Sequence, residues 1–288
     1  MCSSDLCDIR NISFARTLGL RLISEAIAIL GFPGQVLGEA ARVSLLGSDV
    51  PVANSISSVT LDRGLYIGTS AMVSFTGMIA AVFLLPLSHK WSVYVLLFAF
   101  GSALVLAFCG LAIGKRWQVF SGVARAIARL GWIRSWVDGK QSVIAAAENN
   151  LFDFYHQTSG IFWGSLMLNL ASHATAILEV YVLLYLMGAR KSLLVALVVE
   201  ALTKLINVVG TLNPGNVGSF EGGNVIVARL IHISGAAGLT MALCRRVRIL
   251  FWAAVGAVCL TVMSNSRQRK RMHNGGIEFR NNPDLLLP

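Results

Sequence analysis

A run of helix-breaking residues near the end of the chain carries one carboxylate and lies between two apolar segments. It contains Pro214, Gly215, Gly218, Glu221 and Gly222. Hydrocarbon cannot satisfy the backbone N–H and C=O groups that such residues release, so broken backbone at membrane depth faces protein or water. A glycine-rich approach to a helix N-terminus also presents N–H groups that suit a phosphate. The run therefore predicts a polar site within a membrane.

Two interpretations of Glu221 are open. Its carboxylate could contact an ion, a proton or a lipid headgroup beside exposed amides. It could instead only compensate the dipole of a helix that begins near Ser219, an effect of about 0.3–1 kcal/mol. The run lacks the Lys-Ser/Thr pair of a Walker motif and the full Rossmann spacing, so neither nucleotide fold is indicated.

Three arginines, Arg245, Arg246 and Arg248, precede the last apolar segment. Guanidinium groups match phosphate oxygens and stay charged, so the three could clamp a phosphate near the glycine-rich run. Anchoring of the helix end at the membrane interface explains them equally well.

Other charges lie inside or beside apolar segments, where each costs about 2.5–3.5 kcal/mol unless it is paired or hydrated. We expect these residues to share a polar interior. Simple pairing within one helix is the alternative for Glu39 with Arg42 and for Glu200 with Lys204. The charged candidates for the interior are Glu25, Glu39, Arg42, Glu200 and Lys204, with Glu179 and Arg229 as further intramembrane charges.

The sequence offers no metal-ligand set and no recognisable nucleophile. Five cysteines are scattered without a CxxC pair, and His173 stands alone in an apolar run, which is typical of a core histidine. We therefore expect no catalytic residue, metal or cofactor.

Composition places the chain in a membrane. Of its 288 residues 55% are hydrophobic and 13% charged, against about 25% charged in soluble domains, and the mean hydropathy is +0.68. The net charge of +10 comes from basic residues at segment edges, as attraction to anionic lipid predicts, and no aromatic-interleaved basic stripe indicates nucleic acid.

The elements that must position these residues are membrane-spanning helices. Spans of about 20 apolar residues are predicted at 66–87, 91–113, 161–187 and 249–264, with a fifth candidate at 192–209. Two further segments, 20–46 and 212–233, are broken by Pro and Gly. The fold class predicted is an all-α, polytopic helical membrane bundle.

The two broken segments share a pattern. Pro33, Gly34, Gln35 and Val36 precede Glu39, and a Pro-Gly-amide-Val run at 214–217 precedes a second Glu. Paired interruptions in two halves indicate opposed, re-entrant half-helices around a midplane site. A chance match of four residues is the alternative.

One domain is predicted over 11–265. Residues 1–10 are expected to be an unstructured leader and 266–288 a basic, disordered cytoplasmic tail. The polar connector at 115–160 is either an amphipathic helix on anionic headgroups or a pair of soluble helices.

The motif order resembles the lysylphosphatidylglycerol synthase transmembrane region, a flippase-like family, over about residues 20–265. The resemblance extends to its hopanoid-biosynthesis-associated branch. The residues that carry it are Arg21, Glu25, Pro33, Gln35, Gly38, Glu39, Arg42, Asp62, Arg63, Glu200, Pro214, Gly215, Gly218, Glu221, Gly222, Arg245, Arg246 and Arg248.

That resemblance implies a multi-pass protein of the bacterial inner membrane that moves or presents a polar, anionic or amphiphilic lipid. It also implies that further N-terminal spans precede this chain, and that aminoacylation belongs to a domain absent here. Two alternatives stay open: an intramembrane lipid-modifying enzyme using Glu200 and Glu221 as acid and base, and a non-transporting scaffold for lipid-biosynthesis enzymes.

Overall fold

The computed structural model describes residues 14–29, 32–46, 51–85, 88–115, 122, 145–146, 149–150, 159–189, 191–211 and 213–281, with backbone only in 263–281. Within these ranges the protein is helical and contains no strand, which confirms the predicted all-α class. The expected leader at 1–10, most of the 115–160 connector and residues 282–288 lie outside the described residues.

Among the described residues, four helices are long and apolar enough to cross a membrane: α3 (Val52–Leu84), α4 (His89–Gly114), α8 (Ser159–Leu186) and α9 (Leu193–Gly210). They confirm the expected spans near 91–113, 161–187 and 192–209. The span expected at 66–87 is the second half of α3, which begins earlier because a polar half-helix carrying Asp62 and Arg63 precedes the apolar run.

The last helix, α11 (Gly235–Asn281), contains the span expected at 249–264 but is not among those four. It also continues through residues 266–281, where a disordered tail was expected. The run Arg-Gln-Arg-Lys-Arg-Met at 267–272 consists of residues with good helix propensity, so the backbone can propagate through it from the apolar turns before it.

Three helices are short: α1 (Phe14–Ala28), α2 (Phe32–Leu46) and α10 (Ser219–Leu230). A 15-residue helix is about 22 Å long, less than the roughly 30 Å of a hydrocarbon core. Both predicted breaks are present, between α1 and α2 and between α9 and α10.

The two breaks differ in backbone conformation although their sequences match. Pro33 is the second residue of α2, a position where a missing N–H costs nothing. Pro214 instead opens a short 3-10 turn (Pro214–Asn216), and the left-handed residues around it, with φ of 64° at Gly215, 53° at Asn216 and 81° at Gly218, redirect the chain into α10.

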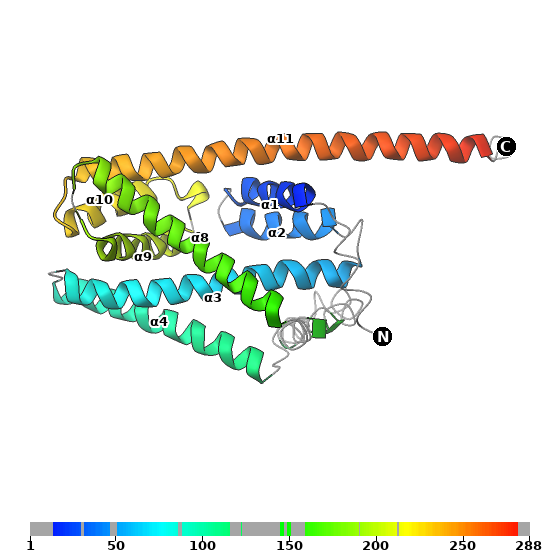
Figure 1. Ribbon diagram of the computed structural model, residues 1–288. Coiled ribbons are helices and arrows are strands. Elements are labelled where there is room, and N and C mark those ends of the chain that lie inside the picture. The colour runs from blue at the N-terminus through cyan, green and yellow to red at the C-terminus, as the bar shows by residue number, and fades with distance from the viewer. Residues whose placement is uncertain are drawn as a thin grey trace.

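The helices are arranged in layers between α11 and α3 (Figure 1). The pair α1 and α2 fills one part of that space, with α1 against α11 and α2 against α3. The pair α10 and α9 fills the other part, with α10 against α11 and α9 against α3. Helix α4 packs on α3, and α8 crosses the bundle while contacting α9 and α3.

The two breaks face each other inside this layer. A Cβ placed on Gly215 would lie 3.7 Å from the carbonyl oxygen of Ile29, the residue that follows α1. In Figure 1 the turn before α10 points toward the α1–α2 pair. Residues nearly two hundred positions apart thus bring two interrupted helix pairs together.

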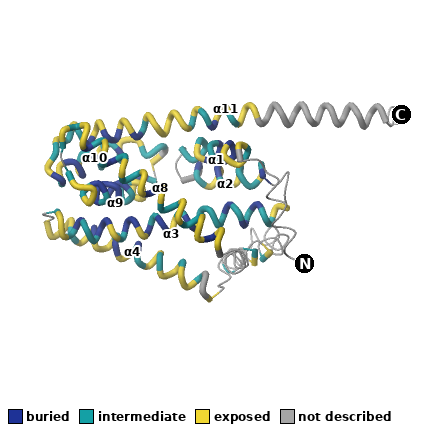
Figure 2. The backbone as a smooth tube through the Cα atoms, viewed as in Figure 1, coloured by how far each residue is buried: buried dark blue, intermediate teal, exposed yellow. Residues whose placement is uncertain are grey.

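Close backbone approach holds the layers. A Cβ on Gly38 of α2 would lie 2.5 Å from the carbonyl oxygen of Ser24, and one on Gly238 of α11 would lie 2.5 Å from that of Asn224. Small residues at helix contacts are typical of membrane bundles. Figure 2 shows buried residues concentrated at the centre of the bundle and exposed ones along α4, α8 and α11. Large apolar residues are among those exposed, as lipid contact requires.

Candidate functional site

A cluster of polar side chains lies in the centre of the bundle, and we call it the central cluster: Tyr66, Thr69, His173, Glu200, Lys204 and Arg245. The Glu200 carboxylate accepts a hydrogen bond of 2.6 Å from the Arg245 guanidinium. Lys204 Nζ, one turn further along α9, is 3.7 Å from the other carboxylate oxygen. The three side chains are buried or nearly so, with exposed fractions of 9%, 6% and 12% for Glu200, Arg245 and Lys204.

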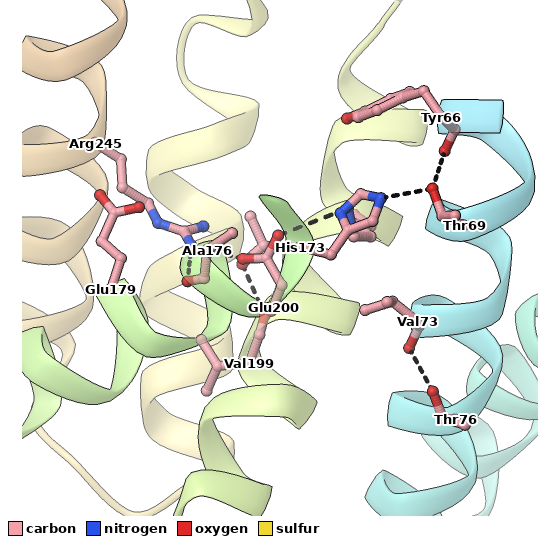
Figure 3. Close-up of polar contacts among 12 residues, drawn as sticks. Tyr66, Thr69, Val73, Thr76, His173, Ala176, Glu179, Val199, Glu200 and Arg245 are labelled. Atoms are coloured by element: carbon pink, nitrogen blue, oxygen red, sulfur yellow. Dashed lines mark hydrogen bonds and ion pairs between the residues drawn. The ribbon is translucent and has the colours of Figure 1, made fainter. Parts of the chain in front are cut away.

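His173 connects this ion pair to α3. Its Nδ1 lies 3.4 Å from Lys204 Nζ and its Nε2 lies 3.2 Å from the Thr69 hydroxyl. Figure 3 shows the imidazole between Thr69 and Glu200, with Tyr66 above it. The Tyr66 and His173 rings have centroids 5.4 Å apart. Four helices, α3, α8, α9 and α11, therefore contribute to one polar contact network.

The central cluster lies at the middle of its helices. His173 is at the midpoint of α8, Glu200 is close to that of α9, and Tyr66 and Thr69 flank that of α3. When these helices cross a bilayer, their midpoints lie near its centre. Ionisable residues at that depth are expensive and mark pathways for substrates, ions or protons.

A second group, the hairpin cluster, joins the α1–α2 pair to α3. Its members are Arg21, Glu25, Gln35, Glu39, Arg42, Asp62 and Arg63. The Asp62 carboxylate accepts hydrogen bonds from Arg21 of α1 and, at 2.7 Å, from Arg42 of α2. Arg63 donates to the Gln35 side chain at 3.1 Å. One carboxylate on α3 thus attaches both short helices.

Weaker pairs complete the hairpin cluster. Glu25 is 3.2 Å from Arg21, and Glu39 is 4.0 Å from Arg42. Glu39 with Arg42 and Glu200 with Lys204 do pair within their helices as the simpler interpretation held. Each pair, however, has a shorter bond to another helix: Arg42 bonds to Asp62 of α3, and Glu200 bonds to Arg245 of α11.

Tyr66 lies between the two clusters. The Arg63 guanidinium carbon is 5.4 Å from the centre of its ring, and Lys204 Nζ is 6.0 Å from the same point. Cations over an aromatic face within about 6 Å are attracted by its quadrupole. The ring therefore makes the polar contacts continuous from α2 to α11.

The glycine-rich run forms a third group, the turn cluster, made by Asn216, Gly218, Glu221 and Arg246. The Glu221 carboxylate accepts the Gly218 N–H at 2.8 Å and lies 2.6 Å from Arg246 Nε. Arg246 also donates to the Asn216 carbonyl at 3.3 Å. Glu221 thus caps α10 and ties the turn to α11, which accounts for the carboxylate by local structure.

The three arginines of α11 do not converge on one point. Arg245 bonds to Glu200, Arg246 to Glu221, and Arg248 to Glu179 of α8. Arg246 is one position from Arg245 and two from Arg248, so its side chain faces away from both of the others, and a joint clamp of all three is geometrically unfavourable. Lipid phosphate binding at the turn, with Pro214 and Gly222 beside it, stays a prediction.

Sequence reasoning did not place three members of the central cluster in the site. Tyr66 and Thr69 are ordinary residues of an apolar helix, and His173 was interpreted as a core histidine. Its burial, with 4% exposed, agrees with that interpretation, but its hydrogen bonds make it part of the network. Its partners are on other helices, so no spacing within one segment could have revealed them.

The described residues contain no group of three or more His, Cys, Asp or Glu side chains that could hold a metal ion. Cys109, Cys244 and Cys259 are free thiols and take no part in the clusters.

Comparison with known proteins gives one match. The family model of the lysylphosphatidylglycerol synthase TM region matches residues 7–256, which is most of the chain. No curated protein and no solved structure matches significantly. The matched region contains all three clusters, together with the four apolar spans. The chain is therefore a membrane protein that belongs to the lysylphosphatidylglycerol synthase transmembrane-region family, a family related to lipid handling.

Proposed function

We propose that this protein moves a polar lipid headgroup across the bilayer, or presents it within the bilayer, through its polar interior. The observation that carries the proposal is the continuous series of polar contacts from Gln35 through Arg63 and Tyr66 to Lys204, Glu200 and Arg245. Asp62, which precedes Arg63 in α3, brings Arg21 and Arg42 to the same end of this series.

The arrangement supports movement because a headgroup loses its hydration when it leaves water. Burial of an unpaired charge costs several kcal/mol, and polar partners spaced along a path replace part of that hydration. The hairpin cluster is the more exposed end, with 54% of the Glu25 side chain exposed, and the central cluster is the buried middle. A headgroup would exchange one set of partners for the next.

The proposal includes no covalent step and needs no cofactor. The family membership and the resemblance to its hopanoid-associated branch support a location in the bacterial inner membrane, a phospholipid or other anionic or amphiphilic lipid as substrate, and lipid-biosynthesis enzymes as neighbours.

The test is leaflet exchange of a headgroup-labelled phospholipid in vesicles that contain the purified protein. We expect exchange with the wild type and a loss of at least about tenfold with Glu200→Gln. Glu179→Gln is the matched carboxylate control, with near wild-type exchange expected, because Glu179 pairs with Arg248 outside the three clusters. Glu221→Ala tests the turn. If the carboxylate only caps α10, the exchange rate per folded protein molecule should equal that of the wild type.

Folding is checked for each variant by size exclusion and circular dichroism. Wild-type vesicles without exchange, or folded Glu200→Gln with full exchange, would contradict transport through the central cluster. The labelled lipid is also recovered and analysed by chromatography. A chemically changed headgroup would favour the enzyme alternative.

A further inference from the structure

The clusters differ in net charge. The hairpin cluster contains Arg21, Arg42 and Arg63 against Glu25, Glu39 and Asp62, so it is balanced. The turn cluster pairs Arg246 with Glu221, and Arg248 pairs with Glu179. In the central cluster two cations share one carboxylate, which leaves one positive charge in excess with His173 neutral.

The excess charge belongs to Lys204. Arg245 approaches Glu200 to 2.6 Å, whereas Lys204 is 3.7 Å away, beyond hydrogen-bond distance. Among the described residues no other carboxylate forms an ion pair with Lys204. Its remaining contacts are the neutral His173 ring nitrogen at 3.4 Å and the face of Tyr66 at 6.0 Å. An ammonium group carries three N–H donors, and these contacts leave at least one of them without an acceptor at good hydrogen-bond distance.

A surplus cation at this depth is costly, since the side chain is only 12% exposed and lies near the middle of three packed helices. The charge that would balance it is a single negative one. A phosphodiester carries one negative charge and accepts hydrogen bonds from an ammonium and a phenol. The imidazole of His173 would donate its N–H to the phosphodiester in place of Thr69.

We propose that Lys204, His173 and Tyr66 form the subsite that binds the phosphodiester of the lipid headgroup, with Glu200 and Arg245 holding Lys204 in place. This assignment rests on the proposed function and gives its substrate class: a lipid with an anionic phosphodiester. Such a site differs from the turn cluster, where the sequence predicted a phosphate, because every charge of the turn cluster already has a partner of opposite sign.

The proposal has a consequence for stability that a structural ion pair would not share. Removal of one partner from a balanced buried pair is strongly destabilising. Removal of a surplus cation relieves an unbalanced charge and is neutral or stabilising in the absence of ligand. Lys204→Met and Arg245→Met therefore separate the two roles at neighbouring positions in one cluster.

The experiment measures the thermal unfolding midpoint of the full chain in non-ionic detergent, with added phosphatidylglycerol, diacylglycerol or inorganic phosphate. A ligand that binds only the folded state raises the midpoint. We expect phosphatidylglycerol to raise it for wild type and diacylglycerol, which lacks the phosphodiester, to leave it unchanged. Lys204→Met should unfold no lower than wild type without lipid and should need at least about tenfold more phosphatidylglycerol for the same rise. Lys204→Arg should restore the rise.

Three results would overturn the assignment: no phosphatidylglycerol effect on wild type, an undiminished effect on Lys204→Met, or a lipid-free midpoint of Lys204→Met that falls as far as that of Arg245→Met. If inorganic phosphate alone raises the midpoint and Lys204→Met abolishes that rise, Lys204 binds an anion, but the anion is free phosphate and not a lipid headgroup. Lipid exchange is measured separately. If phosphatidylglycerol binds in a Lys204-dependent way but no exchange is observed, the transport proposal is wrong and the binding subsite stands.

Discussion

The hairpin cluster and the central cluster use the same kinds of side chain under different conditions. In the hairpin cluster the charges are equal in number, and the side chains of Arg21, Glu25 and Asp62 are 35%, 54% and 32% exposed. In the central cluster Glu200 and Arg245 are almost completely buried, and the cations outnumber the carboxylate. Water can therefore screen the first cluster, whereas the second must satisfy its charges within the protein.

This difference indicates that the two clusters have different roles, one in attaching helices and one in binding. Balanced pairs that are partly exposed, such as Arg21 with Glu25 and Asp62, are individually weak, and here they attach the α1–α2 hairpin to α3. Buried charges hold one geometry and are expensive to leave unpaired, which suits a binding site. Substitutions in each cluster separate these two roles by their effects on stability.

The largest effect is expected for Glu200→Gln. It leaves Arg245 and Lys204 as two buried cations without a carboxylate, so the free energy of unfolding should fall by about 3–5 kcal/mol. Denaturant titration in detergent measures the change. Lys204→Met in the same background should recover part of the loss, and a loss below about 1 kcal/mol would contradict the burial of this pair.

A smaller effect is expected for Gly38→Ala, which acts on the α1–α2 packing and leaves the charges unchanged. Its Cβ would meet the Ser24 carbonyl oxygen at 2.5 Å, so the two helices must separate. Overpacking of this kind costs about 1–3 kcal/mol. Gly64→Ala is the matched control, because a Cβ there meets no atom within 4 Å. Equal unfolding midpoints for the two variants would contradict the close approach.

Asp62→Asn should cost about 1–2 kcal/mol, because both arginine contacts weaken while water reaches part of the site. The cost should shrink as salt is raised, whereas that of Glu200→Gln should not. A double-mutant cycle of Asp62→Asn with Arg42→Gln measures the direct term, expected at about 0.5–1.5 kcal/mol. A salt-independent cost would place Asp62 with the buried charges instead.

The smallest effect is expected for Glu25→Gln. This carboxylate is the most exposed of its cluster, and its one ion pair within the described part of the chain joins it to Arg21, one helical turn away. Exposed pairs of this spacing contribute about 0.3–0.5 kcal/mol. A change in the unfolding midpoint above that of Asp62→Asn would reverse the proposed order within the hairpin cluster.

Sequence patterns predicted four of the five proposed spans and both breaks, because hydrocarbon imposes a simple length requirement on apolar helices. They also identified most of the charged residues, since a charge in an apolar run stands out. Glu25, Glu39, Arg42, Glu200 and Lys204 all lie in the two clusters that meet at Tyr66.

The partners of these charges could not be predicted. Arg245 meets Glu200 and Arg246 meets Glu221 because α10 and α9 pack between α11 and α3, and no local pattern encodes that order. The shared Pro-Gly motif also suggested two equivalent breaks, whereas their backbone conformations differ. Pro33 lies within the first turn of α2, and Pro214 begins a left-handed turn, because only the second motif has Gly218 to carry a positive φ before its helix.

The short helices between α11 and α3 also explain why broken backbone is tolerated in this protein. Helices α1 and α2 are each about 22 Å long and α10 is about 18 Å long, so none of them alone reaches across the roughly 30 Å of a hydrocarbon core. The α1–α2 and α9–α10 pairs occupy two parts of one space, so together they cover a depth that no single short helix covers (Figure 1). The breaks near Ile29 and Gly215 therefore meet inside the protein, away from lipid that could not satisfy their backbone groups.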